Sequence, residues 1–121
     1  MTDSVSANST LILLSTPPSQ DMEPLELALA LAAFDHPVTL LCLGAGLGWL
    51  LGKQQPRKVQ GKSPDKLVSA LPMYDIDQIW YAESALLASP FDAEQLSPLA
   101  RALDDRGIRA LIQQHQHCLR F

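Results

Sequence analysis

Several features that would mark a secreted or membrane protein are scarce in this sequence. Only two of its 121 residues are cysteine, Cys42 and Cys118, so no disulfide framework is expected. The longest mostly apolar stretch, residues 38–51, is interrupted by three glycines. It is also shorter than the about 20 residues that a membrane-spanning helix needs. Residues 1–4 show neither the basic nor the apolar region of a secretory signal. We therefore expect a cytoplasmic protein without membrane association.

Basic side chains are also few. Nine lysines and arginines stand against 13 aspartates and glutamates, which gives a formal charge of −4. Direct nucleic-acid binding usually requires a concentrated basic surface, so this balance argues against it. Five of the nine basic residues do share one segment, and we interpret them as a solvated loop and helix face. They are Lys53, Arg57, Lys58, Lys62 and Lys66.

What the sequence does contain favours one packed α/β domain. Its hydrophobic content is 47%, which suits a globular chain. We expect residues 1–8 to form a flexible tail and residues 9–121 to form the domain. Residues 10–14 and 38–43 are short apolar runs, typical of strands buried on both faces of a parallel sheet. Residues 78–82 predict a third strand through their β-branched and aromatic side chains.

Two helices are predicted between these strands. The first runs from Pro24, a residue suited to a first helical turn, to Phe34, with Asp21 as a candidate cap. The second begins at residues 63–65, Ser-Pro-Asp, and ends near Leu71. Strands that alternate with helices predict a parallel sheet with helices on its faces.

The last third of the chain is compatible with two structures. Residues 96–112 can form one long helix broken at Gly107. Alternatively, residues 99–103 form a strand, Asp104 caps a helix that extends to about residue 114, and a final strand covers residues 116–121. Periodicity alone does not choose between them.

The first helix is apolar on nearly all sides, which suggests a partner. Glu26 is the only charged residue between Leu25 and Phe34, and a domain of this size covers a surface helix on one side only. A second subunit is therefore expected to cover the other side. One apolar face comprises Leu25, Ala28, Leu29 and Ala32, and the second, the hypothetical partner interface, comprises Leu27, Leu31 and Phe34.

The glycine-rich stretch at residues 44–48, Gly-Ala-Gly-Leu-Gly, raises the question of a phosphate cradle because it follows a predicted strand. It matches neither the dinucleotide-binding pattern nor the Walker pattern, and the Trp-Leu-Leu that follows is unsuited to a solvated phosphate. We interpret it as a tight turn from strand to helix.

Neither cysteine has the sequence environment of a nucleophile. Activation requires a nearby cation, base or helix N-terminus. The immediate neighbours of Cys42 are leucines, which favours an inert core residue. Cys118 follows His117 and lies two residues before Arg120, but the adjacent His117 would point to the opposite face of a strand.

Two further pairs are candidates for a metal or an acid–base site. His115 and His117 would share one face of a strand, yet two ligands without a third make a weak metal site. Asp75 and Asp77 form a pair of carboxylates, which we assign to the turn before the third strand. We therefore predict no catalytic residue, metal or cofactor.

Three segments carry a resemblance to a known family. They are residues 23–56, residues 71–80 (Leu-Pro-Met-Tyr-Asp-Ile-Asp-Gln-Ile-Trp) and the ending Leu119-Arg120-Phe121. With them, the chain resembles the TusC family of DsrE/DsrF-like sulfur-relay proteins, from Thr10 onward. Ala45-Gly46 departs from the family pattern, which has Asp-Gly there.

The resemblance implies a parallel sheet flanked by helices, with the last third folded as strand, helix and strand after a cap at Asp104. It also implies TusB-like and TusD-like partners in a hetero-hexamer with two copies of each subunit. Such a complex passes persulfide sulfur, through sulfur-carrier proteins, toward 2-thiolation of the wobble uridine of tRNA. In the active subunit the sulfur-carrying cysteine ends the third strand, where Ala82 stands here. The resemblance therefore implies a structural subunit that is not an enzyme.

Three alternatives remain open from the sequence. A DsrF-like subunit of a dissimilatory sulfur-oxidation complex would have the same fold and stoichiometry. An independent sulfurtransferase would use Cys42 or Cys118 as its nucleophile, and a nucleotide-binding module would use the glycine turn.

Overall fold

The computed structural model describes residues 6–18, 22–51 and 64–121. Five parallel strands form one sheet in the order β4-β3-β2-β1-β5. The strands are β1 (Ser6–Leu14), β2 (Val38–Cys42), β3 (Ile79–Ala82), β4 (Ala100–Leu103) and β5 (His115–Arg120). The α-helices are α1 (Glu23–Ala33), α2 (Pro64–Ala70), α3 (Glu83–Leu87) and α4 (Asp105–Gln113). The described residues also form the 3-10 helices η1 (Gly44–Leu50), η2 (Leu71–Tyr74) and η3 (Ala93–Gln95).

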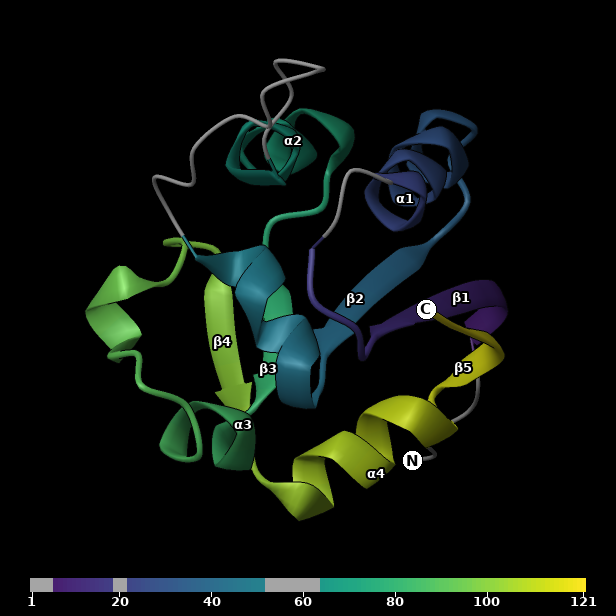
Figure 1. The fold of residues 1–121 in the computed structure, drawn as a ribbon. Coiled ribbons are helices and arrows are strands. Elements are labelled where there is room, and N and C mark those ends of the chain that lie inside the picture. Colours follow the sequence, from purple (N-terminus) through teal and green to yellow (C-terminus); the bar gives the residue numbers. More distant parts are fainter. Residues whose placement is uncertain (1–5, 19–21, 52–63) are drawn as a thin grey trace.

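Helices lie on both faces of the sheet. Helices α1 and α2 lie over one face and α4 lies across the other (Figure 1). The main core fills the space under α1 and α2, where Leu25 packs with Ile12 of β1 and Leu40 of β2. Because side chains alternate along a strand, their neighbours Leu11 and Leu41 face α4 instead. The predicted fold class, a parallel α/β sheet covered on both faces, is confirmed.

Most element boundaries agree with the prediction to within a few residues. The first strand begins earlier than predicted, at Ser6, so the end of the expected tail belongs to β1. Helix α1 begins after Met22, which forms no side-chain cap, and Asp21 lies outside the described residues. Helix α2 stops at Ala70, and the chain continues into η2, which begins with Leu71 and Pro72. A proline disfavours the helical conformation in the residue before it, which explains this end.

The last third folds as strand, helix and strand. Asp104 is the N-cap of α4, and its carboxylate accepts a hydrogen bond of 2.8 Å from the Gly107 amide. This bond satisfies one of the free amides of the first turn. Strand β5 then pairs with β1, and Phe121 extends the pairing through its amide, which donates to the Leu13 carbonyl at 2.8 Å. Within the described residues, no helix is both long and apolar enough to cross a membrane.

Candidate functional site

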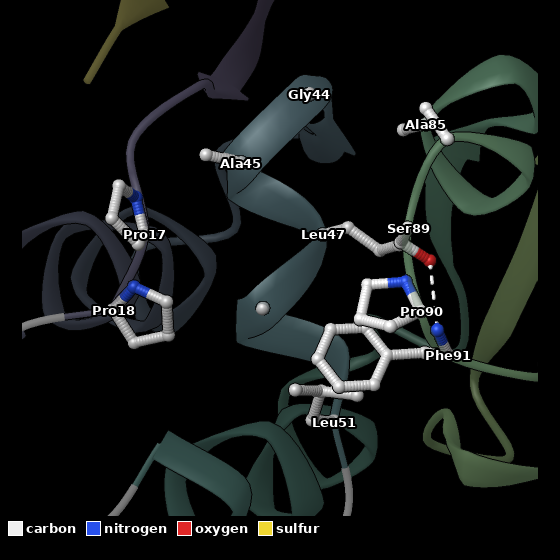
Figure 2. A pocket seen from close by; sticks show the side chains of 12 residues that line it. Pro17, Pro18, Gly44, Ala45, Leu47, Leu51, Ala85, Ser89, Pro90 and Phe91 are labelled. Atoms are coloured by element: carbon white, nitrogen blue, oxygen red, sulfur yellow. Dashed lines mark hydrogen bonds between the residues drawn. The ribbon is translucent and has the colours of Figure 1, made fainter.

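The carboxyl ends of the central strands open into an apolar cleft of about 590 Å³. Three segments form its walls: Pro17 and Pro18 after β1, η1 and Leu51 after β2, and Ala85 of α3 with residues 88–91 that follow this helix. Figure 2 shows η1 between the two prolines and the ring of Phe91. Ligands of open parallel sheets generally bind at this end of the strands. We call this cleft the carboxyl-end cleft, and its position makes it the first candidate for a ligand-binding or catalytic site.

The side chains of the carboxyl-end cleft offer little for chemistry. None of the described residues that line it is ionisable. Its one hydroxyl, Ser89, already donates to the Leu86 carbonyl at 2.8 Å and accepts from the Phe91 amide at 3.2 Å. An anion in the cleft would therefore have no charged side chain among these residues to offset its loss of hydration. The cleft is suited to apolar groups.

Ala82 lies at the carboxyl end of β3, where that strand joins α3, but does not line this cleft. It is the last residue of β3 and the N-cap of α3, and its side chain is 5% exposed. The resemblance places the sulfur-carrying cysteine of an active subunit at or next to this position. In this chain the residue is alanine, and Glu83 and Ser84 follow it.

Cys42 ends β2, and its side chain is fully buried in the main core. Burial among apolar side chains raises the pKa of its thiol well above the ordinary value, because the thiolate would have to form without water. A buried neutral thiol is a poor nucleophile. The interpretation of Cys42 as a core residue is confirmed.

Cys118 is exposed and lies on β5, at one edge of the sheet. It pairs with Leu11 of β1. Strands β1 and β2 separate β5 from β3, so the Cys118 thiol does not reach the end of β3. The structure therefore does not bring the two cysteines together, and it places neither of them in the lining of the carboxyl-end cleft.

The two thiols are expected to differ sharply in reactivity. Iodoacetamide should modify Cys118 in the native protein and Cys42 only after unfolding, because the thiolate is the reacting form and Cys42 is shielded. Intact mass should thus show one added group under native conditions and two in denaturant. The Cys118→Ser variant should show no native modification; a rapid native reaction of that variant would contradict the assignment of Cys42.

The two histidines of β5 do not form a ligand pair. His115 donates from Nδ1 to the Leu111 carbonyl at 2.8 Å, and its Nε2 lies 2.9 Å from the Thr39 hydroxyl. Both ring nitrogens are therefore occupied within the fold. The irregularity in the pairing of β1 with β5 lies in β1, where Ser6 to Thr10 stand opposite His115 to His117. Among the described residues, no group of three or more histidine, cysteine or acidic side chains is arranged to hold a metal.

The remaining candidates fall at the other end of the sheet or outside the described residues. Asp75 occupies the turn before β3, as predicted, with a left-handed φ of 66°, and Asp77 follows it. The basic residues at positions 53–62 lie outside the described residues, and Lys66 falls within α2.

The hypothetical partner interface on α1 is only partly exposed. Leu27 and Leu31 are half-buried and pack against the main core, whereas the Phe34 side chain is 85% exposed. A sequence pattern does not distinguish a half-buried leucine from an exposed one on a helix of this kind. Phe34 is therefore the member of the set that is available to a partner.

Comparisons with known proteins agree with the resemblance. Residues 8–121 match the model of the DsrE/DsrF-like family. The chain is 33% identical, over 97 residues, to a Protein TusC homolog of Pseudomonas aeruginosa, which covers 80% of this chain and 82% of that protein. The crystal structure of the YchN protein from E. coli has the same fold, with a TM-score of 0.81 at 13% identity. That match covers 94% of this chain and 99% of YchN. The chain therefore belongs to the DsrE/DsrF-like family, as its sequence predicted, and is similar to TusC.

Proposed function

We propose that this chain is a structural, non-catalytic subunit of a sulfur-relay complex. Its partners are TusB-like and TusD-like subunits, with two copies of each chain in a hetero-hexamer. The complex passes persulfide sulfur toward 2-thiouridine at the wobble position of tRNA. Similarity to a TusC homolog supports the assignment to a relay. The observation that carries the non-catalytic role is the alanine at position 82, at the end of β3.

The chemistry of sulfur relay explains why this position matters. An acceptor thiolate attacks the outer sulfur of a cysteine persulfide, the S–S bond breaks, and the donor cysteine departs as a thiolate. Both partners need an accessible thiol that ionises readily. At the carboxyl-end cleft the described side chains supply neither a thiol nor a cation to stabilise one. The active cysteine is accordingly assigned to another subunit.

A role in assembly accounts for the exposed apolar side chain on α1. Phe34 projects from the end of the helix next to the half-buried Leu31. Aromatic side chains of this kind are frequent anchors of protein interfaces. We place Phe34 at the centre of the contact with a partner subunit, with Leu27 and Leu31 beneath it.

The proposal is tested by removing both thiols from the assembled complex. The double variant Cys42→Ala/Cys118→Ser, co-expressed with the TusB-like and TusD-like subunits, should still form an assembly with two copies of each chain. Its rate of sulfur transfer to an acceptor thiol should remain within about twofold of the wild-type rate, because the transferring cysteine lies elsewhere. Native mass spectrometry measures the assembly, and a persulfide-donor assay measures the transfer.

The single variants serve as controls in this experiment. Cys118→Ser removes only the exposed thiol, and Cys42→Ala removes only the buried one. If transfer stops in either variant while the assembly persists, this chain is a sulfurtransferase rather than a structural subunit. If the wild-type chain forms no assembly with these partners, the structural role is wrong.

A further inference from the structure

A polar groove at the amino ends of the strands has no part in the proposed function. It consists of two adjoining cavities of about 390 and 350 Å³, which share Val38, Thr39, Asp75 and Ile76. Val38 begins β2, and Asp75 and Ile76 precede β3. The amino-end groove therefore lies at the opposite end of the sheet from the carboxyl-end cleft.

The charged groups of the amino-end groove are mostly acidic. Asp35, Asp75 and Asp77 line it, and among the described residues no lysine or arginine does. Two imidazoles also face it, and both are engaged within the fold. Nε2 of His36 lies 2.8 Å from the Thr10 hydroxyl, and His115 is held by Leu111 and Thr39. The electrostatic field of the groove thus favours a positively charged occupant.

Two of these aspartates stand at backbone positions where a carboxylate is not expected to stabilise the fold. Asp35 follows the end of α1 and Asp75 follows the end of η2, both with left-handed φ angles of 60° and 66°. Glycine or asparagine suits such positions better. A negative side chain at the carboxyl end of a helix is also unfavourable, because the backbone dipole is negative there. We therefore expect asparagine at these two positions to be at least as stable as aspartate.

Exposed apolar side chains adjoin the lining residues Asp35 and Tyr74 in the sequence. Met73 and Tyr74 of η2 are 84% and 40% exposed, and Phe34, the C-cap of α1, is 85% exposed. Tyr74 and Asp35 line the same cavity, and α1 packs against η2. Exposed aromatic side chains and methionine are enriched at protein interfaces, whose rims are polar.

From these observations we propose that the amino-end groove and the adjoining exposed apolar side chains form a docking surface for a partner subunit. The partner segment carries a lysine or arginine, which pairs with Asp35, Asp75 and Asp77, beside an apolar side chain that packs on Phe34 and Met73. The negative charge of the groove supports this occupant, because a basic side chain would complement it. The inference rests on the proposed function, since it specifies where a relay subunit contacts its partner and with which chemistry.

The test compares two triple variants that remove equal charge. Asp35→Asn/Asp75→Asn/Asp77→Asn removes the carboxylates of the groove, and asparagine tolerates the left-handed conformation at positions 35 and 75. Glu83→Gln/Glu94→Gln/Asp105→Asn, the control, removes three carboxylates from exposed positions outside it. Binding to the purified TusB-like and TusD-like subunits is measured by titration calorimetry from about 50 to about 300 mM NaCl, a range over which the screening of exposed charges changes.

The groove variant should bind at least about tenfold more weakly at low salt, with a shallower salt dependence than the wild type, while the control binds as the wild type does. Its melting temperature should equal or exceed that of the wild type, so weaker binding would not reflect unfolding.

If the wild-type chain binds and the groove variant binds equally well, the docking surface is wrong but the relay role stands. If the chain alone dimerises in sedimentation and the groove variant does not, the occupant is a second copy and the proposed partner is wrong. If the wild-type chain binds neither subunit, both proposals fail.

Discussion

Replacing Gly46 with alanine is expected to lower the free energy of unfolding by at least about 3 kcal/mol, a large part of the stability of a small domain. A Cβ atom at this position would lie 1.7 Å from the Leu14 carbonyl oxygen and 2.5 Å from its carbon. These are backbone atoms at the end of β1, and they cannot rotate away. Urea unfolding followed by circular dichroism measures the change.

The clash also acts on the sheet itself. The Leu14 carbonyl accepts a hydrogen bond of 2.9 Å from the Leu43 amide, which joins the chain after β2 to the end of β1. Any shift that relieves the contact with alanine at position 46 weakens this bond. The loss therefore combines steric strain with a weakened hydrogen bond between neighbouring strands.

Gly44→Ala provides the matched control in the same turn. Gly44 has a φ of +52°, and a methyl group on its Cα would meet no atom within 4 Å. Its replacement should cost only the left-handed conformation, about 1 kcal/mol. Equal losses in the two variants would show that backbone conformation, rather than the contact with Leu14, determines the need for glycine. A larger loss at Gly46 would support the interpretation of this stretch as a tight structural turn.

The parts of the fold that were predicted correctly are those in which each segment carries its own signal. The runs around Ile12 and Leu40 are apolar at consecutive positions because both faces of a central parallel strand are buried. Asp104 marks the start of α4 because an N-cap side chain acts within one turn. Such signals are local, so the sequence displays them.

The missed parts depend on contacts between distant segments. The carboxyl-end cleft joins Pro17, Leu47 and Phe91, which no sequence pattern connects. The beginning of β1 at Ser6 was missed because its residues are polar, and its strand conformation comes from pairing with His115. The apolar character of α1 correctly indicated burial, but it did not show that Leu27 and Leu31 pack within their own domain.

This difference within α1 leads to opposite expectations for two similar variants. Leu31→Glu places a carboxylate in a half-buried position against the main core and should lower the free energy of unfolding by about 2 kcal/mol. Phe34→Glu places the same group in solvent and should change stability by less than about 0.5 kcal/mol. The position of Leu31 makes Phe34→Glu the cleaner variant for assembly.

Phe34→Glu should weaken binding to the partner subunits at least about 30-fold, the loss typical of an interface anchor. Unfolding curves establish that the variant is folded, and titration against the TusB-like and TusD-like subunits measures the loss. Ala33→Glu, at a neighbouring exposed position of α1, controls for the added charge. Full binding by Phe34→Glu would remove the end of α1 from the interface. Selective loss in this variant, with its stability intact, would show that the exposed aromatic ring serves association rather than folding.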